Sequence, residues 1–391
     1  MTPTRRLYHD DSALRRFEAV VQAVTAHDGK PAIVLEATAF YPEAGGQLGD
    51  HGTLGGVEVI DTQELESGAI VHVLAADPGL AAGATATGEI DWARRRQHMA
   101  QHTGQHLLSG ALLDRGNAPT VSARLGETAL TIDVARDKIP EAELAAAEAL
   151  ANDLIDDDLA VRAWFPDAGE LAQIKLRRDP KVAADIRVVA IGDFDYSPCG
   201  GTHCSRTSQL AAVRITGAER YKGMTRVTFT AARRGRAALF AHDHVLRALG
   251  QQFSCAPTDV PAAIDKLRKD GEATRAEITA LRGRLADAII ATLPGTGPVI
   301  AAIPADADLL RSIGGKLVTA GRDALLCAPD DTGAAVVLFR AQGSTVDCGA
   351  LWKQLAARLG GRGGGRADRA EGRLAGPVGD WPALVASCAP A

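Results

Sequence analysis

The sequence predicts an α+β protein of several domains, in which a strand-rich N-terminal part precedes regions that mix helices and strands. At 391 residues the chain is too long for one small core. Short β-rich segments separated by glycine-containing turns fill the first 90 residues, and a helical stretch with heptad spacing divides the remainder. The apolar share of 46% and the charged share of 23% are ordinary for a soluble globular protein.

Residues 1–90 are expected to form a small β-barrel or sandwich, and we take the barrel as the prediction. The segments AIVLEATAFY, GTLGGVEVI and AIVHVL are rich in apolar and β-branched residues. Between them, GGQLGDHG has the composition of a turn. Short strands joined by such turns predict a compact all-β domain that carries a GGQ turn.

Residues 91–235 are expected to form an α+β domain. A helix is predicted from near Trp92 to about Leu113, because Leu107, Leu108 and Leu112 give it an apolar face. A second helix is predicted at the alanine-rich segment EAELAAAEALANDLI. Strands are predicted at ETALTIDV, DIRVVAIG and MTRVTFTAA. This mixture indicates one α+β layer structure.

Residues 236–293 are expected to form a helical arm, and residues 294–391 a compact α/β module. In the arm, alternating steps of three and four define a heptad seam made of Ile264, Leu267, Gly271, Thr274, Ile278, Leu281, Leu285 and Ala288. Such a seam predicts a helical hairpin or a dimerising arm. In the module, strands alternate with helices and then give way to the glycine-rich stretch GGRGGGRADRAEGRL.

The bulk properties favour a cytoplasmic protein that does not associate with a membrane. The six cysteines lack the spacing of a disulfide framework, so reduced thiols are expected. The sequence has neither a signal-peptide core near its start nor a run of 18 apolar residues. A net charge of −5 argues against a protein that coats nucleic acid nonspecifically, although local basic surfaces remain compatible with it.

Two short pairs of donor residues predict a metal site. His102 and His106 are four apart on the predicted helix, so both can reach one ion. Cys199 and His203 are also four apart, in the glycine-rich segment CGGTH. Imidazole nitrogen and thiolate sulfur are the donors that zinc favours. We therefore predict one zinc ion per chain, with His98, one helical turn earlier, as a capping or supporting group.

The role of this metal stays open at the level of the sequence. Four protein ligands are typical of a structural site, whereas a catalytic zinc keeps one position for water or substrate. The ion could also orient a substrate. A third alternative is a nucleophilic Cys199 activated by His203. A metalloprotease is excluded, because Thr103 stands where that motif needs glutamate.

The turn from Thr38 to Gly52, with the sequence TAFYPEAGGQLGDHG, is the second informative element. Gly45 and Gly46 allow close approach of the backbone to a ligand, and Gln47 offers both donors and an acceptor. By spacing alone, an ordinary hairpin turn beside a core aromatic residue is the simpler interpretation.

Four segments resemble one known family. AFYPEAGGQLGDHG, HTGQHLL, CGGTH and YKGMTRVTF follow one another in the order found in the editing domain of alanyl-tRNA synthetases and in the free-standing editing proteins called AlaX. The C-terminal GGRGGGRADRAEG is similar to the glycine-rich part of the DHHA1 domain, as in long AlaX proteins. The resemblance therefore covers nearly the whole chain. It implies a trans-editing deacylase for the acceptor end of tRNA(Ala) mischarged with serine, and also with glycine, that does not itself make aminoacyl-tRNA.

The resemblance also implies roles for particular residues. The zinc ligands fall on His102, His106, Cys199 and His203, and the catalytic pocket falls on Thr38, Gly45, Gly46 and Gln47. Thr38 is expected to sense the serine hydroxyl, with Gln47 as a second candidate. Phosphate contacts with tRNA are expected from basic residues in three regions, namely Arg94, Arg95, Arg96, Lys222, Arg362 and Arg366.

Two other classes of function remain as alternatives. One is a zinc-stabilised tRNA-binding module without catalysis, for which a closed four-ligand site would suffice. The other is an interaction factor that forms a homodimer through the helical arm or the C-terminal domain, with the metal as a structural staple. A deacylation assay separates the editing enzyme from both.

Overall fold

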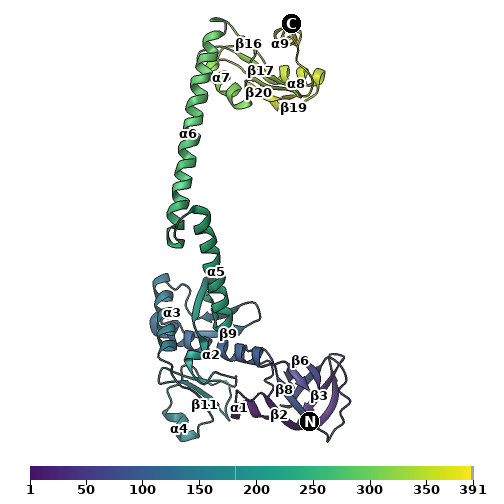
Figure 1. Ribbon diagram of the computed structural model, residues 1–391, viewed down its shortest axis with the longest axis vertical. Coiled ribbons are helices and arrows are strands. Elements are labelled where there is room, and N and C mark those ends of the chain that lie inside the picture. Colours follow the sequence, from purple (N-terminus) through teal and green to yellow (C-terminus); the bar gives the residue numbers. More distant parts are fainter. Residues whose placement is uncertain (181, 389–391) are drawn as a thin grey trace. The chain divides into compact units, whose positions relative to one another are not determined.

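A computed structural model describes residues 1–180 and 182–388, which fold into two compact units (Figure 1). The first unit is Met1–Arg247 and the second is Ala248–Ala391. Helix α5 (Ala232–Phe253) contains the boundary between them. The mixed helix-and-strand class predicted from the sequence is confirmed. Among the described residues, no helix combines the length and apolar character needed to cross a bilayer.

The first unit begins with a closed six-stranded β-barrel. Its strands are β2 (Arg16–His27), β3 (Lys30–Leu35), β5 (Gly52–Leu54), β6 (Val57–Glu64), β7 (Ile70–Leu74) and β8 (Thr85–Ile90). They close in the order β2-β3-β7-β6-β5-β8, with every neighbouring pair antiparallel. Alternate apolar side chains such as Phe17, Ile33 and Leu54 fill the interior. The short elements β1 (Arg5–Arg6), α1 (Leu7–Asp10) and β4 (Ala37–Thr38) lie outside the closed sheet.

Helix α2 (Trp92–Gly116) follows the barrel and forms the centre of the rest of this unit. The Asp91 carboxylate caps its first turn by accepting a hydrogen bond from the amide of Arg94. Asn117, in the left-handed conformation, ends it. Between His98 and Leu112 every residue is buried, so this segment is enclosed rather than amphipathic. That enclosure explains why polar side chains on α2 can meet partners from several other segments.

Two antiparallel sheets and several short helices surround α2. One sheet has the order β14-β15-β10-β9, and the other has the order β11-β12-β13. Helix α3 packs on α2 through alanine and leucine side chains in the largest core cluster. The bounds are β9 (Thr120–Leu125), β10 (Leu130–Val134), α3 (Glu141–Asp156), β11 (Val161–Trp164), α4 (Ala168–Gln173), β12 (Val188–Ile191), β13 (Asp195–Pro198), η1 (Thr207–Leu210), β14 (Val213–Tyr221) and β15 (Met224–Ala231).

The second unit contains a long helix and a five-stranded sheet of order β16-β17-β18-β20-β19. Only β16 and β17 run parallel, and the glycine-rich stretch forms the hairpin of β19 and β20. The bounds are η2 (Pro257–Asp259), α6 (Val260–Thr292), β16 (Val299–Ala302), α7 (Ala307–Thr319), β17 (Ala324–Asp330), β18 (Gly333–Phe339), α8 (Cys348–Leu359), β19 (Gly361–Gly365), β20 (Arg369–Leu374) and α9 (Trp381–Cys388).

The heptad residues predicted for the arm lie on α6, and most of them are solvent-exposed. Leu267, Ile278, Leu281 and Leu285 are 44% to 60% exposed. Near its end, by contrast, α6 buries Ala286 against α7 in a separate apolar cluster. The predicted homodimer through this seam stays a prediction.

Candidate metal centre

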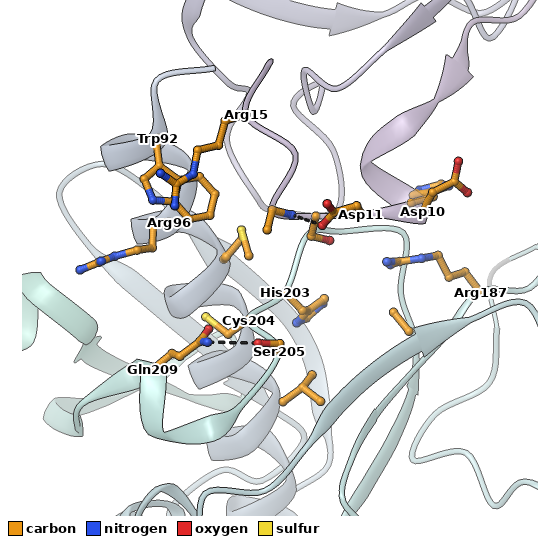
Figure 2. A pocket seen from close by; sticks show the side chains of 16 residues that line it. Asp10, Asp11, Arg15, Trp92, Arg96, Arg187, His203, Cys204, Ser205 and Gln209 are labelled. Carbon is orange, nitrogen blue, oxygen red and sulfur yellow. Dashed lines mark hydrogen bonds between the residues drawn. The ribbon is translucent and has the colours of Figure 1, made fainter. Parts of the chain in front are cut away.

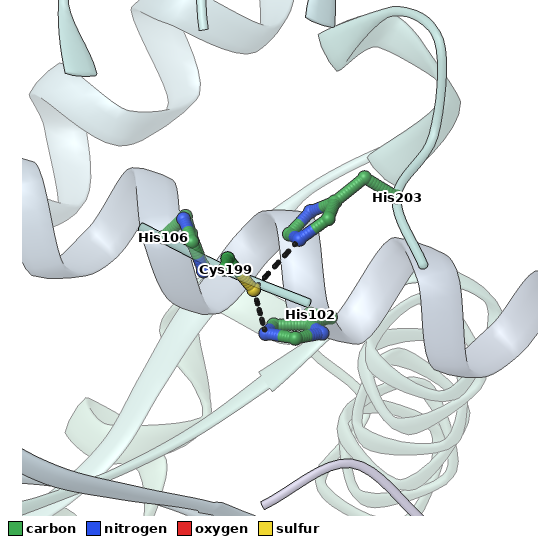
Figure 3. Close-up of side chains that lie close together, drawn as sticks. All are labelled: His102, His106, Cys199 and His203. Atoms are coloured by element: carbon green, nitrogen blue, oxygen red, sulfur yellow. Dashed lines mark hydrogen bonds between the residues drawn. The ribbon is translucent and has the colours of Figure 1, made fainter. Parts of the chain in front are cut away.

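The two donor pairs meet in the first unit. Helix α2 places His102 and His106 one turn apart on the same face, and the loop after β13 brings Cys199 and His203 against that face (Figure 3). The four candidate ligand atoms all lie within 4.8 Å of one another. Segments about a hundred positions apart in the sequence therefore form a single cluster, which the structure shows could hold a metal ion.

The geometry of the cluster fits a tetrahedral ion such as zinc. The Sγ atom of Cys199 lies 3.4 Å from the Nε2 atoms of both His102 and His203. Sulfur and nitrogen ligands on one zinc ion are about 3.6 Å apart, given ordinary bond lengths. His98 is not part of the cluster. It is buried on α2 one turn earlier, where its Nδ1 atom has no hydrogen-bond partner among the described residues.

A separate polar group faces the Nδ1 atom of each histidine in the cluster. His102 Nδ1–H donates to Gln47 Oε1 at 2.7 Å, and His203 Nδ1–H donates to Thr103 Oγ1 at 3.1 Å. His106 Nδ1 lies 3.6 Å from the Asp195 carboxylate, which is an ion-pair distance. These partners favour the tautomers that leave the Nε2 atoms of His102 and His203 directed at Cys199.

The electrostatics of the cluster favour a thiolate. Burial alone would raise the pKa of Cys199, but the three neighbouring imidazoles hold it well below its ordinary value. Burial and the neighbouring His102 lower the pKa of His203 to about 3. For His106, burial acts in the same direction, but the Cys199 thiolate and Asp195 together raise its pKa. A thiolate beside neutral imidazole is the protonation pattern that metal binding requires.

Two side chains from outside the Cys199 loop hold it in place by donating hydrogen bonds to its backbone carbonyl oxygens. Arg187 Nη1 donates to the carbonyl oxygens of Cys199 and Gly201 at 3.1 and 2.8 Å. His9 Nε2–H donates to the Gly200 carbonyl at 3.1 Å. A Cβ atom at Gly201 would lie 2.2 Å from Cε1 of His102, so only glycine permits this approach of the loop to α2.

A cavity of about 530 Å³ opens beside the cluster. His102 and Cys199 line one part of it, and Gly45, Gly46 and Tyr41 line another. Among the described residues, the backbone amides of Gly45 and Gly46 donate no hydrogen bond. Gly46 has a φ of 87°, and a Cβ atom there would lie 2.5 Å from the Ala123 carbonyl oxygen. Both glycines thus line a cavity that also reaches Cys199, and their amides have no acceptor among the described residues.

The structure gives Thr38 and Gln47 places that differ from the predicted ones. Thr38 is fully buried, its hydroxyl lies 2.8 Å from His72 Nε2, and it does not line the cavity. Gln47 is also fully buried. Besides binding His102, its side-chain amide donates to Thr202 Oγ1 at 2.8 Å and its oxygen accepts from the Thr202 amide at 3.2 Å. Both side chains are therefore buried beneath the surface of the cavity, where Thr38 bonds to His72 and Gln47 bonds to His102 and Thr202.

The six basic residues predicted to bind tRNA are in different environments. Arg95 is fully buried and forms an ion pair with Asp50. Its guanidinium is therefore inaccessible to a phosphate of tRNA. Arg94 donates to the Gly49 carbonyl and pairs with Glu127. Arg96 is exposed, as are Lys222, Arg362 and Arg366. The last two belong to the second unit.

Comparisons with known proteins agree with the resemblance. Residues 186–228 match the family model described as threonyl and alanyl tRNA synthetase second additional domain, and residues 9–94 match tRNA synthetases class II (A). The alanine–tRNA ligase of Halorubrum lacusprofundi is 32% identical over 392 residues, which cover 94% of this chain and 42% of that protein. That of Pyrococcus abyssi is 32% identical, with 95% and 42% covered. The chain is a relative of the alanine–tRNA ligases. It spans about two fifths of the length of these curated relatives.

The family matches cover the two segments that face α2 in this alanine–tRNA ligase relative. The match over residues 9–94 contains Gly45, Gly46 and Gln47, and the match over residues 186–228 contains Cys199 and His203. His102 and His106 lie between the matched segments, on the helix that both segments contact. The site is thus built where the two matched regions come together.

Three supporting residues were not predicted from the sequence. Thr103 and Asp195 face two of the histidines, and Arg187 holds the CGGTH loop. A signal for Asp195 was present, since Asp195 and Ser197 alternate along β13, which ends at Pro198, one residue before Cys199. Arg187 is a lone charged residue next to the apolar strand β12, which is unusual unless its charge has a buried partner.

Gln47→Ala is expected to weaken metal binding by about 10- to 100-fold, because His102 loses the acceptor that fixes its tautomer. Gln47→Glu keeps an acceptor oxygen and should restore most of the affinity. Competition with a chromogenic chelator measures the metal dissociation constant. Gln105→Ala is the control, since Gln105 is also buried on this wall but bonds to Ser109. Equal affinities for Gln47→Ala and Gln105→Ala would contradict the role given to Gln47.

Proposed function

We propose that this chain is a trans-editing aminoacyl-tRNA deacylase. It hydrolyses tRNA(Ala) mischarged with serine, and also with glycine, and has no aminoacylation activity of its own. The observation that carries the proposal is the cluster of three histidines and one cysteine beside a cavity with two free backbone donors. Its place in a relative of the alanine–tRNA ligases supplies the substrate class.

The reaction is the hydrolysis of the ester between an amino acid and the terminal ribose. Water attacks the carbonyl carbon, the bond to the ribose oxygen breaks, and that oxygen takes up a proton. A zinc ion held by His102, His106, Cys199 and His203 would supply a Lewis acid at this point. The amides of Gly45 and Gly46 are the protein's donors for the negative charge that develops on the carbonyl oxygen.

Selectivity for serine over alanine requires a polar group that pairs with the substrate hydroxyl. Thr38 and Gln47 are the residues that the resemblance assigns to this task. Both are buried and already hydrogen-bonded in this structure, Thr38 to His72 and Gln47 to His102, so pairing with the substrate hydroxyl requires that one of these bonds is exchanged. The glycine ester has no side-chain hydroxyl to recognise, so we propose that it enters the cavity because it is small.

The second unit is proposed to increase affinity for tRNA. Its β19–β20 hairpin corresponds to the segment that resembles the DHHA1 domain, and it carries the exposed Arg362. Arg366, also exposed, lies between the two strands. These side chains suit phosphate contacts that are independent of sequence. Contact between two copies along α6 would place two such surfaces in one particle.

The proposal is tested with tRNA(Ala) charged with radioactive serine, glycine or alanine. Release of serine and glycine should exceed that of alanine by at least about 100-fold at equal enzyme concentration. Alanine, ATP and uncharged tRNA(Ala) are incubated with the protein in parallel, and no charging is expected. Equal release of all three amino acids, or release no faster than without protein, would refute editing.

One observation favours a second function, which is tRNA binding with a purely structural ion. The cluster offers four protein ligands, and four complete a tetrahedral shell. Under this alternative, removal of the metal lowers the melting temperature while tRNA binding by the folded protein persists, and no deacylation is detected at any metal concentration. The assay with charged tRNA therefore separates the two functions directly.

A further inference from the structure

A second cavity, of about 560 Å³, lies in the first unit next to the metal cluster (Figure 2). His203 lines this cavity, whereas His102 and Cys199 line the cavity beside the GGQ turn. His9 and Arg187 line both. The two cavities therefore adjoin at the metal cluster, with these two side chains between them.

One wall of the second cavity carries an aromatic ring and two cations. The guanidinium carbon of Arg15 lies over the Trp92 ring, 4.2 Å from its centre, so the two side chains form a cation–π pair. Arg96 follows Trp92 by one turn of α2 and lines the same wall. Figure 2 shows the three side chains together at one side of the cavity.

These two cations are free in the described part of the chain, unlike their neighbours. The side chains of Arg15 and Arg96 are exposed and form no ion pair or hydrogen bond with any described residue. Arg94 and Arg95, next along α2, are both engaged, with Glu127 and Asp50 respectively. Among the interactions of the described residues, Arg15 therefore contacts only the Trp92 ring, and both guanidinium groups keep all their N–H donors available for a ligand.

The acidic residues of the cavity do not neutralise them. Asp10 pairs with Arg5 at 3.2 Å, and the Asp11 carboxylate accepts a hydrogen bond from the amide of Ala13 at 2.8 Å. The Asp11 carboxylate keeps its charge, but Arg15, Arg96 and Arg187 outnumber it, so the net charge of the lining is positive and lies beside an aromatic face. This combination is the one that binds single-stranded nucleic acid, in which bases stack and phosphates need cations.

We propose that the second cavity binds the unpaired 3′-terminal nucleotides of the tRNA, with a base stacked against the Trp92–Arg15 pair and phosphates at Arg15 and Arg96. The aminoacyl group then lies in the adjoining cavity beside Gly45 and Gly46, and the ester falls at the metal cluster between the two. This inference rests on the proposed function, because it takes a charged tRNA end as the ligand.

The test measures binding of deacylated tRNA(Ala), with and without its terminal adenosine, by fluorescence anisotropy at one fixed salt concentration. The wild-type protein should bind intact tRNA about tenfold more tightly than the truncated one. Arg15→Gln and Arg96→Gln should each reduce that preference. Arg16→Gln is the matched control, because Arg16 is exposed and adjacent but does not line the cavity.

A second pair of variants tests the stacking surface. Trp92→Leu should abolish the preference for the intact end, whereas Trp164→Leu should keep it. Trp164 also carries an arginine over its ring, with Arg162 at 5.1 Å, but it does not line the cavity. If Trp92→Leu unfolds, the two arginine variants still decide the question, since both side chains are exposed.

The outcomes distinguish the cavity from the catalytic proposal. A preference for the intact end that the Arg15 and Arg96 variants lose supports the cavity assignment, even if serine is not released from charged tRNA. A protein that releases serine normally but binds intact and truncated tRNA equally, or whose Arg15→Gln and Arg96→Gln variants match Arg16→Gln, overturns it.

Discussion

Replacing Cys199 with serine is expected to weaken metal binding by more than about 100-fold and to abolish deacylation of Ser-tRNA(Ala). Loss of a group that only orients a metal-bound histidine costs about 10- to 100-fold in affinity, so loss of the thiolate itself should cost more. Cys199 is also the common neighbour of the imidazoles, with Sγ 3.4 Å from two Nε2 atoms. A hydroxyl is a poor substitute, because it stays protonated where the thiol does not.

Three measurements check this prediction. Metal content by mass spectrometry and thermal stability report on the ion without reference to catalysis, and serine release reports on the reaction. Cys255→Ser is the control, since Cys255 is a free thiol in the second unit, away from the cluster. Chelation of the wild-type protein should reproduce the Cys199→Ser result, and added zinc should reverse it. Full serine release from metal-free, folded protein would refute a role for the ion.

The pH dependence of metal binding should follow the protonation of the same ligands. Because the imidazoles keep the pKa of Cys199 well below its ordinary value, the thiolate persists to lower pH than an ordinary thiol allows. The pKa of His106 is raised, so a proton on this ligand competes with the metal as the pH falls. Metal affinity is therefore expected to be lost on the acidic side and retained on the alkaline side of neutrality.

The metal ligands could be predicted from sequence because their geometry is local. Residues four apart on a helix share a face whatever the rest of the fold does, and CGGTH is short enough to constrain its own two donors. The contacts that complete the site are not local. Gln47 reaches His102 across 55 positions, and only the closure of the barrel beside α2 brings them together.

The three consecutive arginines show what the sequence could not resolve. Successive residues on a helix point about 100° apart, so Arg94, Arg95 and Arg96 must face three directions. Which of them faces the barrel depends on how α2 is rotated against it, and no sequence pattern in RRR encodes this rotation. In the structure Arg95 turns inward, Arg94 reaches the GGQ turn at Gly49, and Arg96 lines the second cavity.

The polar residue Thr38 differs from its predicted place for a related reason. Thr38 and Phe40 are two positions apart and lie on one face, where both contact His72, whose ring centre lies 5.3 Å from that of Phe40. Whether that face lines a ligand cavity depends on what covers it. In this structure His72 of β7 covers that face, and its Nε2 atom lies at hydrogen-bond distance, 2.8 Å, from the Thr38 hydroxyl.

Asp50→Asn is expected to destabilise the first unit by about 3–5 kcal/mol, because it leaves a buried guanidinium without its counter-charge. Arg95 Nε donates to both carboxylate oxygens of Asp50, at 3.0 and 2.9 Å, and both side chains are fully buried. The Tyr41 amide also donates to this carboxylate, at 2.6 Å. Asparagine keeps the size of the side chain but supplies one acceptor oxygen where two are used. Urea unfolding of the full chain, followed by fluorescence and circular dichroism, gives the change in free energy.

The control and the consequence for the site follow from where the pair lies. Asp243→Asn breaks a pair with Arg247 whose side chains are 57% and 69% exposed, so it should cost less than about 0.5 kcal/mol. A similar small effect for Asp50→Asn would show that the buried pair contributes nothing to stability.

The same pair connects the GGQ turn to the ligand helix. Asp50 is three residues after Gln47, and Arg95 is on the helix that carries His102 and His106. The pair therefore fixes the GGQ turn against the ligand helix, and variants that remain folded should also bind the metal more weakly, in the same direction as Gln47→Ala.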